Sequence, residues 1–310
     1  MSTLTSAVLA APNTNGLAKA KLSRWKNAAE QIAGPSLPPR AGKQDAMSTE
    51  WHYAKVFTNS ATGQVSYRTN RFTEIASGLN FRDAVGNWQR TREEFLELPG
   101  AFVAANGGTK VIVARNLYFS GSLDVLTVKG TRLHGHILGI GYFSPVDGRS
   151  VLLGATKPCQ GQLTASNQVL FADAFRNLSA SVRYTYRKSG VSQDVILNAA
   201  VPSPESLGLS PDSVLEIMTE WLPDTAKPFV GQGVVHREKD AAKRARMIEP
   251  DLVDHEITFD DARMAHGFGF DSDAKPGAER VDVYKRFATI SGRRIMTGLW
   301  LSLFHQQHHC

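Results

Sequence analysis

The sequence predicts a mainly β protein, an antiparallel sandwich or a meander of successive hairpins, and two observations carry this prediction. The first is the alternation of apolar and polar residues over 180–187, which gives a strand one apolar face and one wet face. The second is a series of turn signals at short intervals between residues 72 and 197, with no long helical pattern between them. Strands joined by such short turns pair antiparallel, so the pattern excludes a parallel α/β sheet.

Six pairs of apolar stretches flank short loops that are rich in turn-forming residues. The loops lie at residues 83–87, 106–108, 129–130, 145–148, 166–167 and 188–190. Glycine and asparagine suit these positions because they adopt the positive φ angles that tight hairpin turns require. The strongest signal is Asn106-Gly107-Gly108, which separates two apolar stretches. We therefore expect six β-hairpins along this part of the chain.

Three segments outside the hairpins have a different pattern. Apolar residues spaced by three and four in residues 17–32 predict a basic amphipathic helix, which we expect to dock on its own protein rather than on a membrane surface. The prolines of residues 34–40 predict a linker after it. Serine and proline in residues 202–206 predict a short turn of helix. The apolar pattern of residues 213–222 fits both a helix and a strand, so its type stays open.

These patterns divide the chain into four segments. Residues 1–46 hold the N-terminal helix and linker, and residues 47–222 form the antiparallel β domain. Residues 223–255 are expected to be a charged connection, and residues 256–310 a small β extension with an atypical C-terminal tail. Beyond Met296 the apolar residues are clumped rather than alternating. We therefore expect a fragment whose natural continuation is replaced near this point.

Composition excludes several classes of protein. A hydrophobic fraction of 42% and a charged fraction of 21% are those of a globular chain that can bury a sizeable core. Two cysteines make no disulfide framework, and no apolar run approaches the ~20 residues of a membrane span. The net charge of +6 is thinly spread, and the basic run at 239–246 stands in no nucleic-acid-binding module. We expect no transmembrane segment and no nucleic-acid partner.

Two pairs of residues are weak candidates for metal ligands. His134 and His136 form an H-x-H pattern on a predicted strand, so both rings point to the same face. Asp271 and Asp273 place hard oxygen ligands at alternating positions, as in half of a calcium loop. Neither pair completes a site, and surface histidines and a solvated turn are the favoured interpretations. We expect no cofactor and no metal.

Catalytic and sugar-binding patterns are equally incomplete. The carboxylate pairs at 93–94 and 260–261 are adjacent in sequence, and adjacent residues of a strand face opposite ways, so they are not arranged for concerted acid–base work. Trp88 and Trp221 could stack on sugar rings if they are exposed, although most tryptophans of a β domain lie in its core. The sequence contains no nucleophile elbow, P-loop or dinucleotide-binding fingerprint.

Three phrases resemble a known class of proteins. They are FTEIASGLNFRDAVGNWQRTREEFLEL at 72–98, LGIGYF at 138–143 and YTYRK at 184–188. The order of these phrases resembles the N-terminal β-rich region of large exported bacterial proteins of unknown function, of the RHS/YD-repeat-associated surface-protein type. The resemblance covers roughly residues 51–295, and its phrases are structural rather than catalytic. It implies an exported β-rich region of a much larger polypeptide.

The expected function follows from the hairpins and the resemblance. We expect a non-catalytic structural or adhesion β module of a larger exported or surface bacterial protein, not an enzyme. The expected partners are other domains of that polypeptide or cell-surface components. The alternative is a carbohydrate-binding module or a carbohydrate-active enzyme domain with a glycan as partner. Residues 1–12 lack the basic start of a signal peptide, so the secreted or cell-surface location rests on the resemblance.

Overall fold

The structure is a computed structural model that describes residues 31–36, 39–59, 61–270 and 280–300. The chain divides into two compact units, residues 1–75 (unit 1) and residues 76–310 (unit 2). Both units are built from antiparallel sheets, which confirms the predicted fold class. Two short helical turns accompany the strands in the described part of the chain, η1 (Pro204–Leu207) and α2 (Ala241–Arg244).

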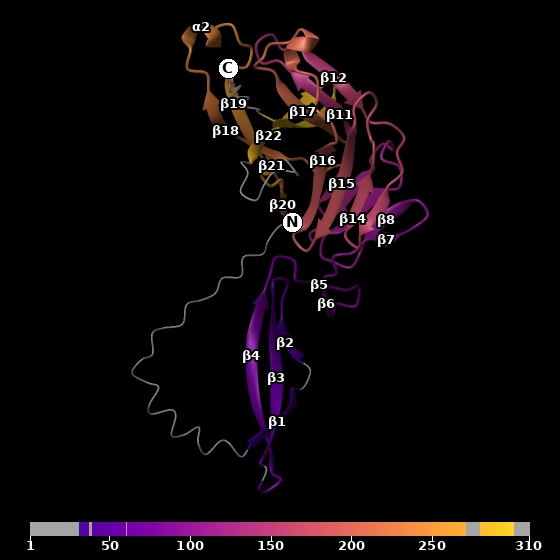
Figure 1. The fold of residues 1–310 in the computed structure, drawn as a ribbon, viewed down its shortest axis with the longest axis vertical. Coiled ribbons are helices and arrows are strands. Elements are labelled where there is room, and N and C mark those ends of the chain that lie inside the picture. The colour runs from indigo at the N-terminus through magenta and orange to yellow at the C-terminus, as the bar shows by residue number, and fades with distance from the viewer. Residues whose placement is uncertain (1–30, 37–38, 60, 271–279, 301–310) are drawn as a thin grey trace, which may run out of the picture. The chain divides into compact units, whose positions relative to one another are not determined.

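Unit 1 is a sheet of four strands with the longest strand at its centre. β3 (Ser48–Asn59) pairs with β4 (Val65–Ile75) along one edge. Along its other edge, β3 pairs with β1 (Gln31–Ser36) at one end and with β2 (Arg40–Gln44) at the other. The β3–β4 pair is the longest ladder of the unit, so this hairpin forms its frame (Figure 1).

The sequence-based interpretation of the N-terminal segment needs correction. The helix predicted over residues 17–32 lies outside the described residues up to position 30, and its last two residues belong to β1. The linker predicted for residues 34–40 is wrong in part, because β1 extends to Ser36 and β2 begins at Arg40. Pro35 lies where the pairing register shifts between Ala33 and Ser36, a position that tolerates a residue without an N–H donor. Pairing with β3 thus overrides the local proline signal.

Unit 2 contains one large sheet and one smaller sheet that face each other. The large sheet has the order β21 (Gly267–Gly269), β22 (Val281–Ile290), β23 (Arg293–Trp300), β17 (Val214–Trp221), β11 (Arg132–Phe143), β10 (Leu123–Leu126), β9 (Lys110–Ala114), β8 (Ala101–Ala104) and β7 (Leu96–Glu97), and β12 (Ser150–Ala155) also pairs with β11. The smaller sheet has the order β13 (Gln162–Ala165), β14 (Gln168–Phe171), β15 (Ala180–Arg187) and β16 (Gly190–Leu197).

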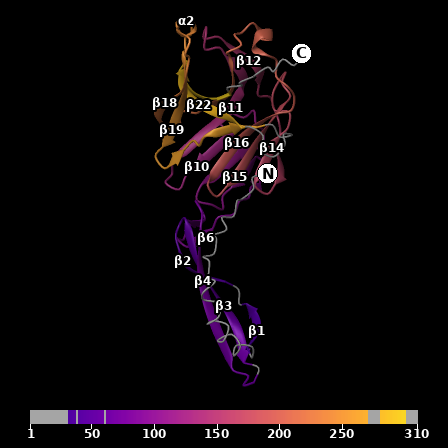
Figure 2. The ribbon, with the colours of Figure 1, turned by 60° about the vertical axis from the view of Figure 1, so that its left-hand side comes forward.

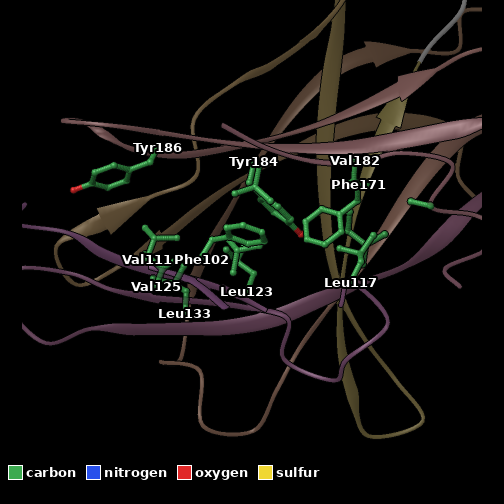
Figure 3. Close-up of a cluster of buried hydrophobic side chains, with 14 of the residues drawn as sticks. Phe102, Val111, Leu117, Leu123, Val125, Leu133, Phe171, Val182, Tyr184 and Tyr186 are labelled. Atoms are coloured by element: carbon green, nitrogen blue, oxygen red, sulfur yellow. The ribbon is translucent and has the colours of Figure 1, made fainter. Parts of the chain in front are cut away.

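The hydrophobic core lies between these two sheets. Figure 3 shows Phe171, Val182 and Tyr184 of the smaller sheet pointing toward Phe102 and Leu123 of the large sheet. All five side chains are buried, and the rings of Phe171 and Tyr184 meet edge-on with centroids 6.1 Å apart. Two antiparallel sheets that bury their facing side chains in this way form a β-sandwich.

Two smaller groups of strands complete unit 2. β5 (Asn80–Arg82) and β6 (Trp88–Arg90) form a hairpin. β18 (Phe229–Arg237), β19 (Asp251–Phe259) and β20 (Ala262–Arg263) form a third sheet, whose β18–β19 hairpin lies beside β22 in both ribbon views (Figures 1 and 2). Ile257 and Phe259 of β19 are buried in the same core cluster as the sandwich residues. The third sheet is therefore anchored to the sandwich by apolar side chains.

The predicted hairpins are all present. They are β5–β6, β8–β9, β10–β11, β11–β12, β13–β14 and β15–β16. The segment whose type was open, 213–222, contains strand β17, because β11 and β23 pair with it on its two edges. The short turn of helix is η1, where Ser203 is the N-cap and Pro204 opens the first turn.

Two predicted boundaries differ from the structure. The charged connection at 223–255 contains β18 and the first half of β19, which pair with each other although most β18 side chains are exposed. The expected break after Met296 is not seen, because β23 continues in ladder register to Trp300 between β22 and β17. Residues 301–310, which include the cluster of His305, His308, His309 and Cys310, lie outside the described residues.

The phrase LGIGYF contains two glycines at positions where the neighbouring strand leaves no room for a Cβ atom. A Cβ atom on Gly139 would lie 2.6 Å from the Gly154 carbonyl oxygen, and one on Gly141 would lie 2.7 Å from the Val151 carbonyl oxygen. Such distances are too short for any larger residue at these positions. The glycines therefore allow β12 to approach β11 closely, and they have a structural role in strand packing.

Candidate functional site

The two histidines of the H-x-H pattern lie on β11 and share a face, as the sequence predicts. His134 Nδ1 lies 2.9 Å from Asp224 Oδ2, and Arg132 contacts the same carboxylate. Hydrogen bonding to His134, with a contribution from the nearby Arg132 guanidinium, lowers the pKa of Asp224. The outer side of the large sheet thus carries an ion-pair network at the end of β11.

The second histidine, His136, is more enclosed. Its Nδ1 accepts a hydrogen bond from the Gly121 N–H at 3.4 Å, and its Nε2 lies 3.5 Å from Glu220 Oε2. Burial lowers the pKa of His136, so the ring is neutral near pH 7. Arg293 forms a two-pronged ion pair with Glu220 and keeps the pKa of that carboxyl low. Both carboxylates beside the histidines are therefore held by arginine.

This arrangement gives no support to the metal-site hypothesis. Within residues 31–36, 39–59, 61–270 and 280–300, no three His, Cys, Asp or Glu side chains are grouped so that they could hold a metal ion. His134 and His136 each face a carboxylate that is already paired with arginine. The other two candidate ligands, Asp271 and Asp273, lie outside the described residues.

The two candidate tryptophans differ in exposure. Trp221 is 6% exposed and packs against Phe259 with ring centroids 6.4 Å apart, so it lies in the core and does not meet the condition of exposure set for sugar stacking. The side chain lies on the face of β17 that packs against the core cluster. Trp88 is half-buried, and the Arg82 guanidinium lies 4.4 Å from its ring centroid. One face of the Trp88 ring is therefore covered by a cation.

Three of the four carboxylates considered for catalysis have separate structural partners. Glu93 accepts a hydrogen bond from the Lys188 N–H at 2.9 Å, and Glu94 accepts one from the Asn106 amide at 3.1 Å. Asp261 accepts hydrogen bonds from the Thr127 hydroxyl and the Lys129 N–H. Asp260 has a positive φ of 25° in the turn between β19 and β20. Each group has a local structural explanation, and these contacts do not describe an acid–base pair.

Two shallow hollows are present on the surface of unit 2. One, of about 370 Å³, is lined by Pro99, Gly100, Ala114, Arg115, Asn116, Phe119 and Gln160. The other, of about 570 Å³, is lined by residues 235–239 together with Arg244. Neither hollow contains the candidate tryptophans or the four carboxylates discussed above.

The strongest candidate site is the sheet of unit 1, and its hairpin gathers aromatic side chains on one face. Residues directly opposite each other in an antiparallel pair point to the same face. Trp51 lies opposite Phe72, and their rings stack with centroids 6.5 Å apart. Tyr53 meets Phe72 edge-on at 6.2 Å, and the Arg68 guanidinium lies 4.8 Å from the Phe57 ring centroid. This face therefore carries four aromatic rings and a cation.

The opposite face of the hairpin carries exposed apolar side chains among polar ones. Tyr67 lies opposite Val56, and Val65 lies opposite Thr58. Tyr67 is 64% exposed and Ile75 is 73% exposed. An antiparallel sheet that faces water on one side normally buries its apolar face and exposes a polar one. The β3–β4 hairpin instead exposes apolar side chains on both faces.

The described side chains of unit 1 form no buried hydrophobic cluster. Among the side chains described in residues 39–75, Thr49 alone is buried. A small sheet normally needs a hydrophobic face packed on something to be stable. Contiguous exposed apolar side chains commonly mark interaction surfaces. We refer to the two faces of the β3–β4 hairpin as the candidate docking faces.

Residues 48–75 of this hairpin were expected to belong to the main β domain, and the hairpin was not predicted as a separate site. A signal was present in the turn between β3 and β4. The Asn59 side-chain oxygen accepts hydrogen bonds from the Ala61 and Thr62 N–H groups, and Gly63 has a positive φ of 70°. Asparagine followed closely by glycine between two alternating stretches predicts a hairpin. No local signal, however, distinguishes a covered hairpin from an uncovered one.

Comparisons with known proteins give no family for this chain. No protein-family model matches it, and no curated protein and no solved structure is similar enough to match. The resemblance to RHS/YD-repeat-associated surface proteins therefore stays a prediction. In the part of the chain that the structure describes, none of the helices has the length and apolar character needed to cross a membrane.

Proposed function

We propose that this chain is a non-catalytic β module of a larger exported or surface bacterial protein, and that it acts in adhesion or assembly through the candidate docking faces. The observation that carries the proposal is the exposure of large apolar side chains on both faces of the β3–β4 hairpin. Covering such faces with another protein surface removes apolar area from water, which favours association by about 25 cal/mol per Å².

The composition of the aromatic face supports a protein partner. Interface cores are rich in tryptophan, tyrosine, phenylalanine and arginine, the residue types that Trp51, Tyr53, Phe72 and Arg68 place together. The Trp51 Nε1–H already donates to Glu74 Oε2 at 3.0 Å, so the ring is fixed in orientation before any partner arrives. A fixed aromatic anchor loses little conformational entropy on binding.

The carbohydrate alternative has less support at the residues first considered for it. Trp221 is buried, and Trp88 has a cation against its ring. The aromatic face of unit 1 is therefore the stronger candidate for a glycan partner. The adhesion experiment distinguishes the two partners.

The experiment compares two double variants of the full chain. Tyr67→Ser with Phe72→Ser removes one exposed ring from each docking face, whereas Val128→Ser with Leu152→Ser removes exposed apolar groups of unit 2 and serves as the matched control. Beads coated with each chain are passed over bacterial cells, and the retained fraction is measured under flow.

We expect beads that carry the wild type or the control to be retained. The retained fraction of beads that carry the docking-face variant should be at least tenfold lower. Protease treatment of the cells should abolish retention, because the expected partner is a protein. Equal retention of all three chains, or no retention of any, contradicts the proposal. Retention that survives protease and is inhibited by free oligosaccharide supports the glycan alternative instead.

A further inference from the structure

Among the described residues, the outer edge of β22 is capped along part of its length by side chains instead of a neighbouring strand. β21 pairs with the first residues of β22, and Val283 is the last of them. The next two outward N–H groups belong to Lys285 and Phe287. Lys285 N–H donates to Asp254 Oδ1 at 2.8 Å, and Phe287 N–H donates to His255 Nδ1 at 2.9 Å. Two adjacent side chains of β19 thus replace a strand at this edge.

The C-terminal end and the middle of β19 are held by different interactions. Near its C-terminal end, Ile257 and Phe259 are buried in the hydrophobic core, and Phe259 contacts Trp221. Near the middle of the strand, the ties to β22 are polar. The Lys285 ammonium, itself 8% exposed, lies 3.1 and 3.2 Å from the two Asp254 carboxylate oxygens. The polar ties depend on charge state, whereas the apolar anchor does not.

His255 accepts a hydrogen bond, which fixes its protonation state. The Nδ1 atom accepts from Phe287 N–H, so that atom carries no proton. The Nε2 atom therefore carries the proton, and the Gln232 amide nitrogen of β18, 3.3 Å away, is a neighbouring donor and not its acceptor. An imidazolium ion carries a proton on each ring nitrogen and therefore has no acceptor atom. Protonation of His255 thus breaks the hydrogen bond from Phe287 N–H and leaves that group facing the Nδ1–H of the ring.

The surroundings of His255 include charges from every neighbouring element. Arg286 of β22 repels the imidazolium, while Asp254 on the same strand attracts it. Lys285 of β22 and His266 before β21 compete for Asp254, since His266 Nδ1 lies 3.8 Å from Asp254 Oδ2. Burial, followed by Arg286, lowers the pKa of His255 below its usual value.

Glu249 and Glu216 complete the surroundings through Arg286. Arg286 forms an ion pair with Glu249, which precedes β19, and its charge also acts on Glu216 of β17. These two carboxyl groups act on the charge of Arg286 and so change how strongly Arg286 repels the imidazolium. Neither of them takes the place of His255 Nδ1 as the acceptor for Phe287 N–H.

We propose that the β18–β19 hairpin is an acid-released flap, in which protonation of His255 detaches the middle of β19 from β22 and uncovers the β22 edge. A histidine whose folded-state pKa is lowered stabilises the closed flap above its unfolded pKa of about 6.5. That stabilisation is lost as the pH falls below this value. The uncovered edge presents the N–H groups of Lys285 and Phe287, which an incoming strand can use for pairing.

Hydrogen exchange of backbone amides in the full chain tests the flap directly. Protection factors, corrected for the intrinsic effect of pH on exchange, are compared between pH 7.5 and pH 5.0. We expect protection at Lys285 and Phe287 to fall at least tenfold in acid, together with the amides of the β18–β19 hairpin. Protection in β15, at the centre of the sandwich, should not change.

The decisive variant is His255→Asn, whose side-chain oxygen takes the position of Nδ1 and accepts the same hydrogen bond without titrating. We expect the acid-induced loss of protection to vanish in this variant and to persist in the control variant His236→Asn, which changes an exposed histidine of β18. Persistence of the loss in His255→Asn, or its absence from the wild type, overturns the proposal.

A measurement on the wild type keeps the test valid if His255→Asn fails to fold. The titration of each imidazole is followed by NMR, and its midpoint is compared with the midpoint of the loss of protection at Phe287. Coincidence with His255 supports the flap. Coincidence with His266 instead of His255 overturns it.

Discussion

The β3–β4 hairpin and strand β15 alternate in sequence and pair antiparallel, yet their tyrosines have opposite environments. Tyr184 of β15 is 0% exposed, because the large sheet faces it across the sandwich. Tyr67 of β4 is 64% exposed and has a half-buried valine, Val56, opposite it in the ladder. The comparison teaches that alternation defines the two faces of a strand, whereas burial requires a second layer to cover one of them.

The largest effect is expected for Tyr184→Ala. The variant removes a ring that packs edge-on against Phe171 in the core, so we expect the free energy of unfolding to fall by about 3–5 kcal/mol. Urea unfolding followed by near-UV circular dichroism of the full chain measures the loss. A loss below about 1 kcal/mol would show that the two sheets do not pack as a sandwich here.

The second effect concerns a buried carboxyl group of unit 2. Glu216 is 6% exposed, and burial raises its pKa to about 7, with Arg286 opposing the shift. Between pH 4.5 and 7 the unfolded chain ionises this group while the folded chain keeps the proton, so its contribution makes the fold less stable as the pH rises through that range.

Glu216→Gln should remove this pH dependence. We expect the variant to match the wild type near pH 4.5 and to exceed its free energy of unfolding by on the order of 2–3 kcal/mol at pH 8. Urea unfolding at several pH values measures the difference. A difference between variant and wild type that does not change with pH would show that Glu216 is ionised in the folded protein.

A smaller effect is expected for Arg183→Ala, on the same strand as Tyr184 but on its other face. Arg183 forms a half-exposed ion pair with Asp194 of β16 at 2.9 Å. Half-exposed pairs of this kind contribute about 0–1 kcal/mol, so the variant should lose less than about 1 kcal/mol. The same urea experiment checks it, and a loss equal to that of Tyr184→Ala would invert the assignment of faces in β15.

The smallest effect is expected for Tyr67→Ala, which makes the same chemical change as Tyr184→Ala at an uncovered position. Its free energy of unfolding should stay within about 0.5 kcal/mol of the wild type, because exposed side chains make few contacts to lose. Hydrogen exchange of the β3 and β4 amides reports on unit 1 alone. A marked loss of protection throughout these strands would show that Tyr67 is a core residue and that the docking faces are covered in the free chain.

Turn chemistry made much of the fold predictable. The six hairpin loops are each defined within two to five residues, because glycine, asparagine and serine set the turn conformation locally. The alternation of residues 180–187 likewise identified Tyr184 as a core residue, and the spacing of His134 and His136 correctly placed both on one face of a strand. These features depend only on neighbours along the chain.

Pairing between distant segments decided the rest. Residues 213–222 are a strand because β11 and β23 lie on both edges, and 229–237 are a strand because β19 pairs with them, although their own side chains are mostly exposed. The exposure of the described apolar side chains of the β3–β4 hairpin also has no local signal. By itself, the sequence determined the turns and faces of the strands through short-range conformational preference. Only the tertiary structure decided which faces are covered, because burial depends on the second surface that a face meets.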